Sequence, residues 1–96
     1  MTDQAPAPAP LPLPVRAIVT ETWIDRVADW PAAVWERWGV ELDGFTEAEL
    51  LRAVRIFARR GSAFPPSWGE VYAIATPMRT HRLERAALAS YQGNPS

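Results

Sequence analysis

Apolar residues recur at helical spacing from residue 15 onward, which predicts a chain built of short helices. In the first stretch, 15–30, large apolar residues follow one another at i, i+4, i+8 and i+11: Val19, Trp23, Val27 and Trp30. This spacing places them on one face of a helix. The start of the helix has two interpretations, because Pro14 suits a first helical turn, whereas Thr20 or Thr22 would cap a shorter helix.

A second, shorter helix is predicted over 32–38. Asp29 is suited to capping it, Pro31 is tolerated in a first turn, and Gly39 suits the left-handed position that follows a helix end. A helix of this length is marginal alone, so its tryptophans need a core to pack against. Asp43-Gly44 then predicts a turn; the same dipeptide would suit a β-hairpin, but its flanks do not alternate as strands do.

The clearest helix signal begins at Thr46 and ends at Gly61. Thr46 and Glu49 have the spacing of a capping box, and Phe45 and Leu50 have that of a hydrophobic staple. Glutamates at the start and arginines at the end complement the helix dipole, and glycine favours the left-handed residue after the end. The buried stripe is expected to consist of Leu50, Leu51, Val54, Phe57 and Ala58.

The stretch 64–70, Phe-Pro-Pro-Ser-Trp-Gly-Glu, separates that helix from the next. Ser67 and Glu70 form a second capping-box pattern, and the two prolines cannot continue a helix from behind. Phe64 is a large apolar residue on a loop, a position that usually requires a core to dock against. We therefore expect a rigid corner with a buried Phe64.

Two further helices are predicted after this corner. The first covers 68–75; Thr76-Pro77 then repeats the pattern of a cap followed by a proline and begins the second helix, 77–90. This last helix is poor in apolar residues and carries arginines three residues apart: Arg79, Arg82 and Arg85.

Together these elements predict an all-α protein, a small bundle of four to five short helices around a Trp/Phe-rich core. Residues 1–14 are expected to form a proline-rich arm without helix. Within it, 5–14 alternates proline with Ala or Leu and favours polyproline II, as a spacer or as a recognition ligand. Residues 15–91 are expected to form a single helical domain and 92–96 a frayed tail.

The composition argues against several classes of chemistry. The 96 residues include no Cys and a single His, His81, which excludes disulfides, thiolate or histidine-rich metal sites and a Ser-His-Asp triad within one chain. There is no Lys for a Walker loop, and capping explains Glu47 and Glu49 better than acid–base catalysis does. We expect no catalytic residue, metal, cofactor or small-molecule substrate. Without a signal-peptide pattern or an apolar run of about 20 residues, a cytoplasmic protein is expected.

Charge is divided unevenly along the chain. The net charge is −1, yet residues 1–51 carry three arginines against nine carboxylates, net −6, and residues 52–96 carry seven against two, net +5. Every basic residue is Arg, which reflects either codon usage or a need for bidentate contacts to carboxylates or phosphates. The arginines after residue 76 have three interpretations: a solvated helix face, a contact with an acidic protein groove, or a contact with phosphates.

The candidate partner-binding surface combines arginines with aromatic residues after the corner. Trp68 is expected to be half exposed at the first position of its helix, where it would anchor a partner beside Tyr72. The full candidate set is Trp68, Tyr72, Arg59, Arg60, Arg79, Arg82 and Arg85.

Several of these motifs occur together in a known family. The motifs are Trp30-Pro31, Trp38, Leu42, Leu50 to Ala58, and Phe64-Pro65-Pro66-Ser67 with Glu70, Val71 and Ile74. With them, the segment 27–75 resembles the helical domain of phage-encoded replicative helicase loaders, the loader/inhibitor family of Gram-positive phages. It is more distantly similar to the replication protein P type of lambdoid phages.

The resemblance implies a non-enzymatic adaptor that binds the hexameric replicative helicase, as a loader or as an inhibitor. In that family the helicase contact lies largely in a flexible region after the helical domain, whereas here the residues after Ala75 are helical by pattern. This departure and the proline-rich arm suit a relative that inhibits a host replication protein without loading it. The alternative is a small DNA-binding or regulatory domain that uses the Arg-rich C-terminal half.

Overall fold

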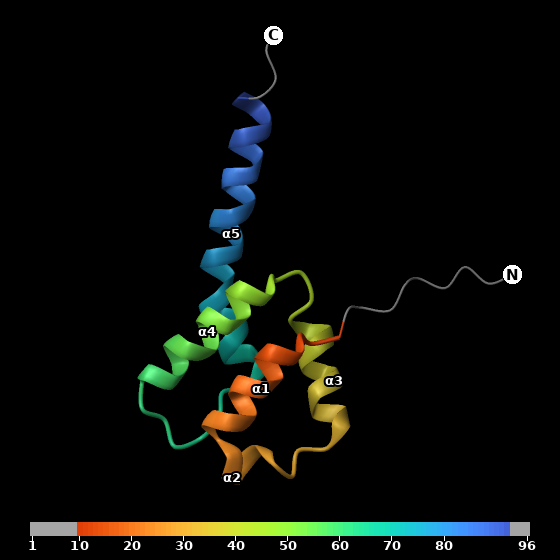
Figure 1. Cartoon of the computed structure of the whole chain (residues 1–96). Coiled ribbons are helices and arrows are strands. Elements are labelled where there is room, and N and C mark those ends of the chain that lie inside the picture. The colour runs from red at the N-terminus through yellow and green to blue at the C-terminus, as the bar shows by residue number, and fades with distance from the viewer. Residues whose placement is uncertain (1–9, 93–96) are drawn as a thin grey trace, which may run out of the picture.

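The computed structural model describes residues 10–92, and every regular element in that range is a helix (Figure 1). This confirms the all-α prediction. The elements in chain order are α1 (Leu13–Thr22), α2 (Ile24–Val27), α3 (Ala32–Glu41), α4 (Glu47–Arg59) and α5 (Trp68–Gln92).

The core lies where α4 packs against both α1 and α5. Val15 and Val19 of α1 and Val54 of α4 are completely buried, and α5 adds Val71. The predicted stripe of α4 is confirmed at Leu50, Val54 and Phe57, and Ala53 extends it; Leu51 and Ala58 lie partly buried at its edge. Three tryptophan rings close one side, with centroids 5.1–5.9 Å apart: Trp30, Trp35 and Trp38.

The first helix begins earlier and ends earlier than its pattern predicts. It starts at Leu13, so the expectation that the proline run forms no helix is wrong for its last residues. Pro14 is accommodated because N–H groups of the first turn need no partner within the helix. Leu11 is 8% exposed and belongs to the core. Residues 1–9 of the predicted arm and 93–96 of the predicted tail lie outside the described residues. Gln92, where the tail was expected to begin, is the last residue of α5.

Trp23 divides the predicted helix 15–30 into α1 and α2. Its backbone leaves the helical region, at φ −123° and ψ 46°. The ring is buried against Phe57 with centroids 5.9 Å apart, and its indole N–H donates to the carbonyl of Ser62 at 3.1 Å. The break therefore turns a large side chain into the core and satisfies its one polar atom.

Gly39 does not end the second predicted helix. It lies buried inside α3, which continues to Glu41. A small residue is suited to this position because the segment that contains Leu11 runs past it, and both residues line the same small cavity. The positive φ values are found instead at Gly44 and Gly61, at 96° and 75°, which confirms the predicted turn and the predicted end of α4.

The capping box at the 64–70 corner is confirmed, but Phe64 is not buried. The Ser67 N–H donates to Glu70 Oε1 at 2.9 Å, and the Glu70 N–H donates to Ser67 Oγ at 3.2 Å. The buried residue of the corner is Pro66, whereas Phe64 is 60% exposed. Its ring lies under the Arg26 guanidinium, 4.0 Å from the centroid, and this surface contact replaces the expected contact with the core.

The two helices predicted after the corner are one helix, α5. Thr76 does not cap a new helix; its hydroxyl donates to the carbonyl of Tyr72 at 2.6 Å, one turn earlier. Pro77 lies inside the helix and supplies no N–H, so one backbone hydrogen bond is missing there. Buried Val71 and Ala75 before Pro77, and the contacts of Arg79 and Arg82 after it, hold α5 in a single direction. The C-terminal part of α5 extends away from the other helices (Figure 1).

Alanine substitutions of Phe57 and Phe64 test whether the first ring is buried and the second exposed. Phe57→Ala should lower the free energy of unfolding by about 3–5 kcal/mol, because the ring is buried between helices. Phe64→Ala should cost about 1 kcal/mol or less, since it removes an exposed ring and one cation–π contact. Urea denaturation followed by tryptophan fluorescence measures both. Equal losses for the two variants would contradict the exposed position of Phe64.

Candidate functional site

Two of the predicted partner-binding residues, Tyr72 and Arg79, form a cluster with Phe45. The Phe45 and Tyr72 rings meet edge to face with centroids 5.3 Å apart. The Arg79 guanidinium lies 4.2 Å from the Phe45 centroid, and one of its N–H groups donates to the Tyr72 hydroxyl at 3.3 Å. Arg79 therefore connects α5 to Phe45, the residue before the cap of α4. It has a structural role besides its predicted role in partner binding.

Arg82 is held by the N-terminal end of α4. Its Nε donates to Glu49 Oε2 at 2.8 Å, and a terminal N–H group donates to Glu49 Oε1 at 3.3 Å and to the Gly44 carbonyl at 3.1 Å. Glu49 is 8% exposed and also accepts from the Thr46 N–H at 2.9 Å, which completes the predicted capping box. One carboxylate thus caps α4 and binds α5.

These contacts alter the protonation of both partners. The hydrogen bond from Arg82, and then that from the Thr46 backbone, hold the pKa of Glu49 below its ordinary value of 4.5 against the opposing effect of burial. The hydrogen bond to Glu49 raises the pKa of Arg82. The pair stays ionised across the neutral range, and its hydrogen bonds hold Arg82 against α4.

Of the other predicted residues, only Arg85 lines a groove together with Arg82, and the rest lie elsewhere. Arg85 lies exposed on α5, whereas Arg59 and Arg60 lie at the opposite end of α4, about 15 Å from Glu49 at 1.5 Å per residue. Trp68 is half-buried as predicted, and faces a different groove beneath Arg37, whose guanidinium is 5.8 Å from its ring.

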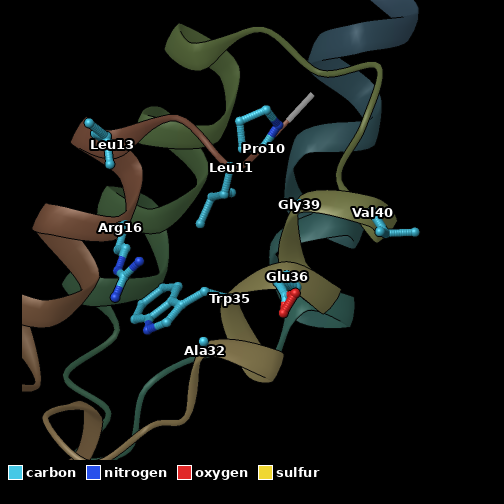
Figure 2. A pocket seen from close by; sticks show the side chains of 9 residues that line it. All are labelled: Pro10, Leu11, Leu13, Arg16, Ala32, Trp35, Glu36, Gly39 and Val40. Carbon is cyan, nitrogen blue, oxygen red and sulfur yellow. The ribbon is translucent and has the colours of Figure 1, made fainter. Parts of the chain in front are cut away.

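Three of the concave regions on the described residues bear on the search for a site. The tryptophan groove, about 550 Å³, lies between α3 and the corner and is lined by Trp30, Val34, Arg37, Pro65 and Trp68 among others. A second, about 410 Å³, lies where residues 10–13 run beside α3; Figure 2 shows Leu11 and Trp35 there, with Arg16 and Glu36 as the charged groups. Its lining offers no nucleophile with an adjacent base.

The third concave region, the α4/α5 groove, lies beside the Glu49–Arg82 pair and measures about 360 Å³. Its lining residues are Ala48, Glu49, Arg52, Met78, His81, Arg82 and Arg85. Sequence reasoning missed Arg52 as a candidate. The signal was present, because Arg52, Arg55 and Arg59 recur at i, i+3 and i+7 and so share the exposed side of α4.

The described residues contain no group of three or more acidic or histidine side chains that could hold a metal ion. In the same range, no helix has the length and apolar character needed to cross a membrane. Comparison with known proteins adds no assignment: no family model, no curated protein and no solved structure matches the chain.

The lowered pKa of Glu49 predicts a contribution to acid sensitivity. A depressed carboxyl pKa stabilises the fold fully above the ordinary value and loses this effect as the pH falls through the folded value. Glu49→Gln should therefore be less stable than wild type at pH 7, and this difference should shrink below about pH 4.5. Thermal melts between neutral and acid pH measure it.

Glu41→Gln is the matched control for this experiment. Glu41 forms an i,i+4 pair with Arg37 at 2.7 Å, in which the Arg37 side chain is 63% exposed. Surface pairs of this kind contribute about 0.5 kcal/mol or less, so its melts should follow wild type. A Glu49→Gln difference that stays constant with pH would contradict the assigned ion pair.

Proposed function

We propose that this chain is a cytoplasmic, non-enzymatic adaptor that binds another protein through the C-terminal part of α5. The observation that carries the proposal is the exposure of every residue from Leu83 to Tyr91. Leu83, Leu88 and Tyr91 are 53%, 59% and 82% exposed, although all three are large apolar or aromatic side chains. Leu83, Ala87 and Tyr91 recur at i, i+4 and i+8 and so share one face.

A helix segment of this kind gains little stability by itself. Isolated helices shorter than about 12–15 residues are marginal in water, and most helices in proteins depend on packing of an apolar face. Among the described residues no other element covers this face. Figure 1 shows that this part of α5 extends away from the other helices. An amphipathic helix that enters a groove of a partner is a recurrent mode of recognition.

The identity of the partner is proposed from the resemblance to helicase loaders. That resemblance rests on motifs spread over 27–75, from Trp30-Pro31 to the corner, and it favours a phage or prophage protein that binds a replicative helicase or another replication protein. Whether it loads or inhibits, the same surface would be required. The capping boxes at Thr46 and Ser67 support the proposal because they fix the directions of the two helices that carry the exposed groups.

Retention on an immobilised replicative helicase tests this proposal. Leu83→Glu/Tyr91→Glu should reduce retention at least tenfold, about 1.4 kcal/mol, because it places two charges on the apolar face. The control is Leu13→Glu/Ile24→Glu, at side chains that are 76% and 58% exposed on α1 and α2. Equal retention of both double variants would contradict the assigned surface. Failure of wild type to bind would contradict the choice of helicase.

The alternative function is a small DNA-binding or regulatory domain. The observation that favours it is the row of Arg52, Arg55 and Arg59, which is exposed and arginine-only. Neutralisation of phosphates releases counterions, so such binding must weaken steeply as salt increases. Absence of binding to duplex DNA at low salt would eliminate this alternative.

A further inference from the structure

The outer side of α4 carries a line of positive charge, which we name the arginine row: Arg52, Arg55 and Arg59. All three side chains are exposed, and among the described residues no carboxylate lies within ion-pair distance of any of them. Like charges at i,i+3 and i,i+4 destabilise a helix. Glu49, three residues before Arg52, is the carboxylate of α4 at suitable spacing, and Arg82 already engages it.

The arginine row continues into the α4/α5 groove. Arg52 lines that groove together with Arg85 and His81 from α5, both exposed. Ala48 and the half-buried Met78 supply its apolar part. The one carboxylate among its lining residues, Glu49, already accepts hydrogen bonds from Arg82 and from the Thr46 backbone. The groove therefore offers cationic groups around a small apolar surface.

We propose that this face binds an acidic amphipathic segment of a partner protein. Carboxylates of the segment would contact the arginine row, since guanidinium groups bind carboxylates in bidentate geometry. An apolar side chain next to them would enter the α4/α5 groove against Ala48 and Met78. The inference rests on the proposed adaptor function and adds the chemistry of the bound segment and a second surface, distinct from the tip of α5.

The charge distribution favours a peptide over a nucleic acid. The whole chain has a net charge of −1, and residues 1–51 have a net charge of −6, so a long polyanion would meet a repulsive field from much of the molecule. A short acidic segment can contact the arginine row without meeting that field. The apolar part of the groove also has no counterpart on a phosphate backbone.

A labelled synthetic peptide probes this surface directly. It would be a helix-forming peptide with Glu at i, i+3 and i+7 and Leu on the adjacent side, compared with the same peptide carrying Gln in place of Glu. Fluorescence anisotropy should show at least tenfold tighter binding of the Glu peptide to the full chain. Arg55→Gln/Arg85→Gln should weaken that binding at least tenfold.

Arg16→Gln/Arg37→Gln is the matched control, because it removes the same charge from exposed arginines on α1 and α3 and should leave binding within twofold. Circular dichroism melts establish that each variant folds. No binding of the Glu peptide, equal binding of both peptides, or equal loss in both double variants would overturn the proposal. Binding of duplex DNA that depends on Arg55 and Arg85, without peptide binding, would overturn it in favour of a nucleic acid.

Two further experiments test whether the acidic ligand is a second copy of this chain and whether the tip of α5 takes part in peptide binding. Sedimentation at low salt should find a monomer; self-association that Arg55→Gln/Arg85→Gln abolishes would show that the acidic ligand is a second copy and would overturn the proposal. Leu83→Glu/Tyr91→Glu should bind the Glu peptide as wild type does, because the tip of α5 is a separate surface. Helicase retention and peptide binding can therefore fail independently.

Discussion

The rest of the structure depends on the carboxylate of Glu49. It accepts from the Thr46 backbone and so begins α4, and it accepts from Arg82 and so sets the direction of α5. Because the group is 8% exposed, removal of either partner would leave much of a charge away from water. The core of α1, α4 and α5 gives the fold its stability, and this group, together with the contacts of Arg79, fixes the direction of the uncovered part of α5.

Much of the fold could be predicted from local sequence, because its signals act over three or four residues. The capping boxes at Thr46 and Ser67 are of this kind, as are the turn at Gly44 and the stripe of α4. Local reasoning failed at Pro77, because the contacts of Arg79 and Arg82 hold the helix together across a proline that would otherwise favour a break. It failed at Gly39 as well, because the glycine is buried inside α3 and the helix continues past it to Glu41.

The candidate site was predicted less well than the fold. The arginine pattern of the C-terminal half identified Arg79 and Arg82. Arg79 contacts Phe45, on the loop before α4, and Arg82 contacts Glu49, more than thirty residues away. No sequence window could show that these two were engaged. Of the exposed arginines of α4, Arg59 was predicted, but Arg52 and Arg55 were not, although the three form one helical repeat. The exposed position of Phe64 was also beyond local reasoning, since Arg26 of α2 covers its ring from a distant part of the chain.

The projection of α5 also has a mechanical consequence. Tyr91 lies nine residues beyond Arg82, a lever arm of about 14 Å at 1.5 Å per residue. Pro77 weakens the helix on the other side of Arg82, between that residue and the core contacts of Val71 and Ala75. A sideways load at the tip therefore produces a torque that the Glu49–Arg82 pair must resist. Docking at the far end of the molecule would be transmitted to the first turn of α4.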